Sequence, residues 1–308
     1  MTPQLGGLYP PIPTPFDERD QVAVDHLQRN LARWINEPLD GIVMPGSNSE
    51  AVFLSPAERS LVWRVCADVL RPSGKRFIAG TGAETTAATI ALTQEAAEWG
   101  AVATLVIPPH FYKPSLAHDA LVTHYRAIAD ASPIPILLYN VPAFTGVDFA
   151  LPTLLALAEH PNIVGMKDSS SNVVKMAELR AQRPDFQIFA GTGSALLPFL
   201  SIGAVGGIMA LANVAAAPLR RLTDAFERGD LVEARQIQLA LAPLNSAITS
   251  RYGVAGLKYA MDQAGFYGGP TRRPLLPLND AARREIDRLL AEVRDTRHET
   301  RDTRGVTG

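Results

Sequence analysis

The stretch "NIVGMKDSS" at residues 162–170 runs from an apolar segment straight into a lysine, an aspartate and two serines. Short apolar runs of this kind are typical of strands that are buried on both faces. An ammonium group at the end of such a strand is costly to desolvate unless it is paired or loses its proton. The strand pattern alone leaves two interpretations of Lys167 open, a structural pair with a carboxylate such as Asp168 or a chemical role.

Seven further segments of similar character alternate with longer stretches of helical period. The eight predicted strands lie at 7–14, 41–46, 76–82, 103–109, 135–140, 163–169, 187–193 and 205–212. Repeated strand–helix units predict an α/β fold with a parallel sheet, and eight of them predict a (β/α)8 TIM barrel. With 308 residues, of which 47% are hydrophobic, the chain is long enough for one such barrel.

Helix signals suggest how the chain is divided. The clearest helix is predicted to begin after Ser55, where Pro56 and Glu58 complete a capping box with a proline at the first helical position. No strand is expected after the eighth, and the segments that follow have helical period. We therefore expect the barrel over 1–214, a C-terminal helical extension over 215–294, and a disordered tail over 295–308, where "RDTR" occurs twice.

Composition excludes several classes of function. The chain has 29 Lys+Arg against 31 Asp+Glu, without a basic block in its body, so neither a nucleic-acid surface nor membrane adsorption is expected. No apolar run approaches the ~18 residues of a membrane span. Cys66 is the single cysteine, and the N-terminal segment lacks the pattern of a signal peptide, which predicts a cytoplasmic protein. The six histidines show no ligand spacing such as HExxH, so no metal is expected.

Two predicted strand ends contain "AGTG", at 79–82 and 190–193. A dinucleotide-binding turn requires a third small residue three positions further on, whereas Thr85 and Leu196 stand there. We therefore expect no nucleotide cofactor. The glycines either let the backbone turn at the barrel mouth or leave room there for a ligand.

Polar residues that end apolar strands carry the functional prediction, because the carboxyl ends of barrel strands open onto the active site. Lys167 ends the sixth strand, and an amine among apolar neighbours has a lowered pKa and can attack a ketone to form a Schiff base. Tyr139 ends the fifth strand, where its hydroxyl could relay protons. The segment "PGSNSE" at 45–50 ends the second strand with donors suited to a carboxylate.

Four segments together resemble the dihydrodipicolinate synthase/N-acetylneuraminate lyase family of class I, Schiff-base pyruvate aldolases. They are "GSNSEAVFLSPAER" at 46–59, "YNVPAFTG" at 139–146, "VGMKDSS" at 164–170 and "GAVGGIMALAN" at 203–213. They occur in matching order on matching strand ends, and the resemblance covers nearly the whole chain.

The resemblance implies the roles of individual residues. Lys167 would form an imine with pyruvate or another 2-oxo acid, Tyr139 would shuttle the proton, and Ser47 with Asn48 would bind the carboxylate of the 2-oxo acid. Ser47 also counts among the catalytic residues, and the further substrate contacts are expected from Ser169, Gly191, Ile208 and Phe144. Candidates for contact with the aldehyde half are His110, Phe144, Ser169, Ser170 and Thr192. The family implies neither a metal nor an organic cofactor, and it implies a homotetramer built as a dimer of dimers.

Two departures from the family pattern bear on the substrate. Dihydrodipicolinate synthases usually carry an arginine at the position of Phe144, where it pairs with the carboxylate of aspartate semialdehyde, and a proton-relaying tyrosine at the position of Phe111. A ring at Phe144 removes a bidentate carboxylate partner, so for that substrate another cation, Lys113 or an arginine from a neighbouring subunit, would have to take its place. The segments "GSN", "NVPAFTG" and "HPNIVGMKDS" are closer to 4-hydroxy-2-oxoglutarate aldolases of the same family, except that those typically have glycine at Ser49.

The first hypothesis is therefore an aldolase that cleaves a 4-hydroxy-2-oxo acid, 4-hydroxy-2-oxoglutarate above all, to pyruvate and an aldehyde. The alternatives are a synthase that condenses pyruvate with aspartate semialdehyde, and a sugar-acid lyase or hydratase-aldolase with an apolar pocket lined by Phe111 and Phe144. A catalytically silent sensor or binding protein is a fourth possibility. Lys258, within a helical segment, is expected to be a surface or interface lysine and not the reactive amine.

Overall fold

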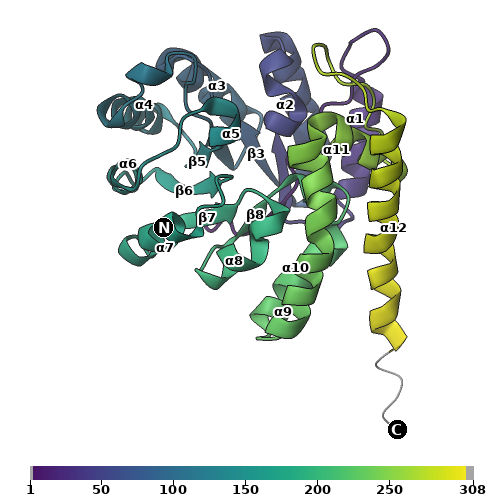
Figure 1. Cartoon of the computed structure of the whole chain (residues 1–308). Coiled ribbons are helices and arrows are strands. Elements are labelled where there is room, and N and C mark those ends of the chain that lie inside the picture. The colour runs from purple at the N-terminus through teal and green to yellow at the C-terminus, as the bar shows by residue number, and fades with distance from the viewer. Residues whose placement is uncertain (1–2, 303–308) are drawn as a thin grey trace.

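Eight short parallel strands curl into a barrel surrounded by helices (Figure 1). The structure, a computed structural model, describes residues 3–302, with the backbone alone over 295–302. The strands are β1 (Gly7–Tyr9), β2 (Gly41–Met44), β3 (Arg76–Gly80), β4 (Ala103–Val106), β5 (Ile136–Asn140), β6 (Ile163–Asp168), β7 (Gln187–Ala190) and β8 (Gly206–Ile208). Their order in the sheet is β1-β8-β7-β6-β5-β4-β3-β2.

The first and last strands in this order close the ring through the residues that follow β1. Val43 N donates to Pro10 O and Ile12 N donates to Val43 O, each at 3.0 Å. The predicted (β/α)8 barrel is therefore confirmed. The strands are shorter than expected, because residues at their carboxyl ends, such as the glycines at 191 and 193, leave the ladder and form loops at the barrel mouth.

The helices that surround the barrel follow the strands along the chain. They are α1 (Val24–Trp34), α2 (Pro56–Leu70), α3 (Thr86–Glu98), α4 (His118–Ala131), α5 (Pro142–Thr145), α6 (Leu151–Leu157), α7 (Val173–Gln182) and α8 (Leu196–Ser201). The predicted start of α2 is confirmed: Glu58 N donates to Ser55 Oγ at 3.2 Å, and Ser55 N donates to Glu58 Oε2 at 2.9 Å. This reciprocal cap satisfies two amides that a helix start leaves without partners.

Side chains alternate between the barrel interior and the layer beneath the helices. The inward positions form one apolar cluster, made of Leu5, Tyr9, Val43, Ile78, Ala103, Leu105, Leu137, Tyr139, Val141, Val164, Phe189 and Ile208. The intervening residues pack in the larger cluster between sheet and helices. This two-sided burial explains why the strands read as continuous apolar runs and not as alternating ones.

Strand β6 contains an irregularity that decides where its lysine points. Ile136 pairs with Ile163, but Leu137 pairs with Gly165, so β6 has one residue more than β5 over the same length. Val164 lies in the interior cluster and Met166 in the outer one. The extra residue shifts the alternation, as a β-bulge does, and Lys167 consequently faces the interior three positions after Val164 instead of two.

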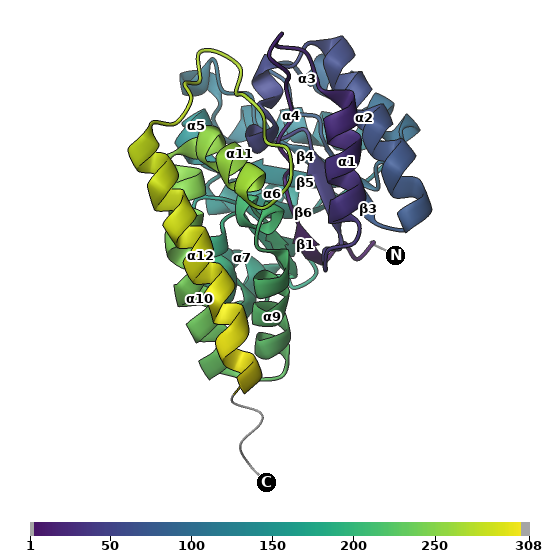
Figure 2. The same ribbon diagram turned by 90° about the vertical axis from the view of Figure 1, so that its right-hand side faces the viewer.

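After β8 the chain continues in helices only, within the described residues. They are α9 (Ala216–Glu227), α10 (Leu231–Ser246), a π-helical turn at Ala247–Arg251, α11 (Gly253–Gln263) and α12 (Asp280–Asp302). The green α10 and the yellow α12 pack side by side along one flank of the barrel (Figures 1 and 2). The tail expected over 295–308 begins inside α12, since no proline or glycine interrupts the sequence there, and 303–308 lie outside the described residues.

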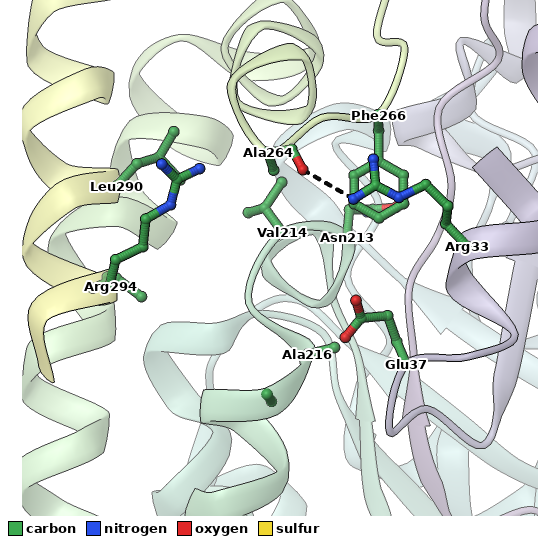
Figure 3. A pocket seen from close by; sticks show the side chains of 11 residues that line it. Arg33, Glu37, Asn213, Val214, Ala216, Ala264, Phe266, Leu290 and Arg294 are labelled. Atoms are coloured by element: carbon green, nitrogen blue, oxygen red, sulfur yellow. Dashed lines mark hydrogen bonds between the residues drawn. The ribbon is translucent and has the colours of Figure 1, made fainter. Parts of the chain in front are cut away.

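A pocket of about 180 Å³ opens between the barrel and these C-terminal helices (Figure 3). Its arginines are already bonded to backbone carbonyls, Arg33 to Ala264 O at 3.3 Å and Arg294 to Gln263 O at 2.8 Å. None of the strand-end residues singled out in the sequence lines it. Among the described residues, no helix is long and apolar enough to cross a membrane.

Candidate active site

Lys167 and Tyr139 lie opposite one another on neighbouring strands. The register pairs them directly, and both side chains enter the barrel, where they are 4% and 6% exposed. Lys167 Nζ lies 4.1 Å from the centroid of the Tyr139 ring. The two residues that the sequence placed at adjacent strand ends therefore share one site at the mouth of the barrel.

The Tyr139 hydroxyl is the link to the loop after β2. It lies 3.2 Å from Ser47 Oγ, within hydrogen-bond distance. Burial alone would raise the pKa of Tyr139, but the positive charge of Lys167 and hydrogen bonds with Ser47, Lys167 and Ser169 outweigh burial and lower that pKa. A phenol with a lowered pKa gives up and regains its proton more readily near neutral pH.

The loop after β2 forms a short 3-10 turn, η1 (Ser47–Ser49), which leaves Ser47 and Asn48 partly exposed at the mouth. Ser49 is buried and holds the turn: its hydroxyl accepts from Gly46 N at 2.9 Å and donates to Ile12 O, and its carbonyl accepts from Thr14 Oγ1 at 2.7 Å. The serine that departs from the aldolase pattern thus has a structural function in this chain.

Ser169 and Gly191 meet on the other side of Lys167. A Cβ atom at Gly191 would lie 2.1 Å from Ser169 Oγ and 2.5 Å from Asp168 O, so only glycine fits here. Ile208 faces the interior next to these residues and is fully buried in the barrel cluster. The structure therefore gathers Lys167 and five other expected substrate or catalytic residues (Tyr139, Ser47, Ser169, Gly191 and Ile208) at one end of the barrel.

Asp168 does not pair with Lys167, although it is the next residue along the chain. It faces the opposite side of the sheet, where Asn140 Nδ2 donates to its Oδ1 at 2.7 Å and Ser170 Oγ donates to its Oδ2 at 2.8 Å. Burial raises the pKa of Asp168, against these hydrogen bonds. Asn140 follows Tyr139, and Asp168 follows Lys167. The hydrogen bond between Asn140 and Asp168 on the outer face of the sheet therefore holds together the two strand ends that carry Tyr139 and Lys167.

The extent of this outer network was not anticipated from the sequence. Asn140 Nδ2 also donates to Asp148 Oδ1 at 2.8 Å, and Lys175 Nζ lies 2.6 Å from the same oxygen. The sequence does contain one signal: a polar residue directly follows both Tyr139 and Lys167. Parallel pairing of the two strands places these polar residues, Asn140 and Asp168, opposite one another.

Several other candidates are engaged in structural hydrogen bonds. His110 Nδ1 lies 3.0 Å from Glu84 Oε1, and the Glu84 carboxylate also accepts from the amide of Phe111 at 3.0 Å. Thr192 Oγ1 accepts from Asn245 Nδ2 at 2.9 Å. Asn245 belongs to α10, so a C-terminal helix holds the loop that follows β7.

The residues that depart from the synthase pattern project into solvent in this single chain. Phe111 and Phe144 are 74% and 66% exposed, and Tyr112, the neighbour of Phe111 in the chain, is 73% exposed. Lys113, directly after Tyr112, reaches toward the segment that carries Phe144. Its Nζ would lie 3.0 Å from a Cβ atom at Gly146. A cation therefore stands beside Gly146, two residues after Phe144.

No group of three or more His, Cys, Asp or Glu side chains in the described part of the chain is arranged to hold a metal ion. The polar groups at the barrel mouth are an amine, hydroxyls and an amide. These groups suit covalent attachment and binding of a 2-oxo acid.

Comparison with known proteins gives a consistent result. The family model described as "Dihydrodipicolinate synthetase family" matches residues 4–293. A 4-hydroxy-tetrahydrodipicolinate synthase of Methanococcoides burtonii is 35% identical over 292 residues, which cover 93% of this chain and 98% of the relative. The solved 4-hydroxy-tetrahydrodipicolinate synthase of Methylacidiphilum fumariolicum SolV has a TM-score of 0.91 at 32% identity and covers 97% of this chain and 99% of its own. A chloride-inhibited dihydrodipicolinate synthase of Acinetobacter baumannii, solved in complex with pyruvate, has a TM-score of 0.89 at 30% identity, covering 94% and 99% of the two chains.

Proposed function

The chain belongs to the dihydrodipicolinate synthetase family, and from that premise we propose that it forms a Schiff base between Lys167 and pyruvate and uses it to make or break a carbon–carbon bond. Membership of this family supports the enzyme class, a Schiff-base lyase. The observation that carries the proposal is the position of Lys167 Nζ 4.1 Å from the ring of Tyr139, whose hydroxyl lies 3.2 Å from Ser47 Oγ.

The chemistry follows from these groups. Once its ammonium group has given up a proton, the amine of Lys167 attacks C2 of pyruvate, water leaves, and an imine remains. Loss of a proton from C3 gives an enamine, whose C3 attacks an aldehyde; the reverse sequence cleaves a 4-hydroxy-2-oxo acid. Tyr139, with its lowered pKa, moves protons to and from these atoms, and Ser47 with Asn48 binds the pyruvate carboxylate.

For the second substrate we propose aspartate semialdehyde, which makes the chain a 4-hydroxy-tetrahydrodipicolinate synthase. The names of relatives at 35% identity over nearly the whole chain support this reaction over the cleavage expected from single motifs. Lys113 supports it from the structure, because its ammonium lies beside Gly146 and supplies the positive charge that Phe144 does not.

Cleavage of 4-hydroxy-2-oxoglutarate is the second candidate. The exposed ring of Phe144 favours it, since that side chain cannot donate a hydrogen bond to the carboxylate of aspartate semialdehyde. Assays of pyruvate release from a panel of 4-hydroxy-2-oxo acids, run beside condensation of pyruvate with aspartate semialdehyde, decide between the two by the larger kcat/KM. A homotetrameric assembly, a cytoplasmic location and independence from metals remain predictions that belong to the same proposal.

A further inference from the structure

The turn that presents Ser47 and Asn48 ends at a residue in an unfavourable backbone conformation. Glu50, directly after η1, has φ 56° and ψ 38°, the left-handed region that favours glycine. A residue other than glycine persists there only when its surroundings hold it in place.

Those surroundings come from α11 and from the loop that follows it. Glu50 is 2% exposed, and its Oε1 lies 2.6 Å from Nζ of Lys258 in α11, which is 1% exposed. The contact is an ion pair, without the alignment of a hydrogen bond at that oxygen. The other carboxylate oxygen, Oε2, accepts from Arg272 N at 2.8 Å. Lys258 is thus a buried structural cation, and the expectation of a surface or interface lysine is wrong for this chain.

Arg272 extends the connection to the next turn. Its guanidinium donates to Phe53 O at 2.8 Å and to Glu58 Oε2 at 2.9 Å. Its guanidinium carbon and Lys258 Nζ lie 4.1 Å and 4.5 Å from the ring centroid of the fully buried Phe16. The segment from Ser47 to Phe53 is therefore anchored in its middle and at its end by residues that follow the barrel in the sequence.

We propose that Glu50 and Lys258 are positioning residues for the pyruvate carboxylate: their buried pair holds the left-handed turn at Glu50 and thereby orients Ser47 and Asn48. This inference rests on the proposed imine chemistry. It connects the helical extension to the active site, because Lys258 in α11 anchors the loop that carries Ser47 and Asn48. Removal of the pair should weaken pyruvate binding and leave the chemistry at Lys167 nearly unchanged, since neither residue touches Lys167 or Tyr139 in the contacts of the described chain.

The test measures trapping of pyruvate by borohydride on the full-length protein, as a function of pyruvate concentration. Glu50→Gln should raise the half-saturating concentration at least ~10-fold and change the trapping rate at saturation less than ~3-fold. Glu50→Gln and Lys258→Met each leave one buried charge without its partner and are at risk of not folding, so Glu50→Gln/Lys258→Met, which removes both charges, is measured beside them. The double variant should show the same raised half-saturation.

Two further variants make the result specific. Arg220→Met is the matched control, because it removes an ion pair of 2.5 Å between Arg220 in α9 and Asp40 that does not involve the turn; it should keep the wild-type half-saturation. Glu50→Gly allows the left-handed backbone without the anchor, and should behave like Glu50→Gln.

The outcomes separate the inference from the proposed function. Wild-type half-saturation in folded Glu50→Gln or Glu50→Gly would overturn the positioning role alone. An equal rise in Arg220→Met would also overturn it, because general destabilisation would then explain the effect. Absence of trapping in the wild-type protein would overturn the proposed function and the inference that depends on it.

Discussion

Lys167 and Tyr139 are paired across β5 and β6, with the lysine Nζ 4.1 Å from the centre of the tyrosine ring. The residues that follow them, Asp168 and Asn140, are also paired and are joined by a 2.7 Å hydrogen bond on the other face of the sheet. In the proposed mechanism the interior pair provides the chemistry, and the exterior pair fixes the strand ends that carry it. Lys167 thus stands on a strand, whereas Ser47 and Asn48 stand on a loop turn.

The first prediction concerns the site of imine formation. Treatment with borohydride and pyruvate should add one reduced pyruvyl group, found on Lys167 by peptide mass mapping. Lys258 should remain unmodified, since it is 1% exposed and paired with Glu50. Lys167→Ala should abolish the adduct. An adduct on Lys258, or none on the wild-type protein, would contradict the proposed mechanism.

The second prediction concerns the link between Ser47 and Tyr139. The hydrogen bond with Ser47 is among the causes that lower the pKa of Tyr139, so Ser47→Ala should raise that pKa and shift the alkaline titration of the phenol to higher pH. Ultraviolet absorption of tyrosinate measures the shift, and the Tyr139→Phe difference spectrum identifies the signal. An unchanged titration in Ser47→Ala would show that the two hydroxyls are not coupled.

Tyr139→Phe itself should lower kcat by about 10²- to 10³-fold, the range for loss of one proton-transferring group. Single-turnover rates with the preferred substrate pair measure this effect. The half-saturation for pyruvate should change much less, because the ring and its contact with Lys167 remain. A kcat near that of the wild-type enzyme would mean that the proton passes through another group.

The fold could be predicted from the sequence because each strand is buried on both faces and each is followed by a helix. Few folds are compatible with that pattern. Lys167 and Tyr139 could be predicted because polar residues at the ends of apolar strands are conspicuous. That Lys167 points inward, however, depends on the extra residue in β6, and a period-two reading from Val164 would have turned the lysine outward. Such an irregularity has no local sequence signature here.

The role of Lys258 could not be predicted for a different reason. Its partner Glu50 lies 208 positions earlier in the chain, and an ion pair at that separation leaves no periodic pattern. The charge of Lys258 and its place in a helical segment favour a surface position. The buried Glu50 carboxylate, which reverses this conclusion, comes close to Lys258 only in the folded chain. The approach of Lys113 to Gly146 is likewise absent from any sequence pattern, because it joins two separate loops.

The fourth prediction concerns acid stability. Hydrogen bonds from Arg272 are the main cause that lowers the pKa of Glu58 to about 2. Because the folded-state pKa is lower than that of the unfolded chain, this pairing stabilises the protein fully above the unfolded value near 4.5 and is lost as pH falls toward 2. Wild-type protein should therefore lose more stability between pH 5 and pH 3 than Glu58→Gln, as measured by urea unfolding. Equal losses in the two proteins would contradict the role of this pair.

The last prediction tests the second substrate. If Lys113 supplies the charge that Phe144 does not, Lys113→Met should lower kcat/KM for condensation with aspartate semialdehyde by about 10-fold, because a hydrogen bond to a charged group contributes about 1.5 kcal/mol once the bound substrate covers it. Pyruvate trapping at Lys167 should be unaffected, since the substituted side chain lies on a loop away from the β2 turn. Phe144→Arg introduced into Lys113→Met should restore the efficiency, because it places a guanidinium in the same region. If Lys113→Met changes nothing, and wild-type enzyme cleaves 4-hydroxy-2-oxoglutarate with the higher kcat/KM, then the exposed ring of Phe144 marks a pocket that selects against aspartate semialdehyde, and the aldolase reaction is the correct one.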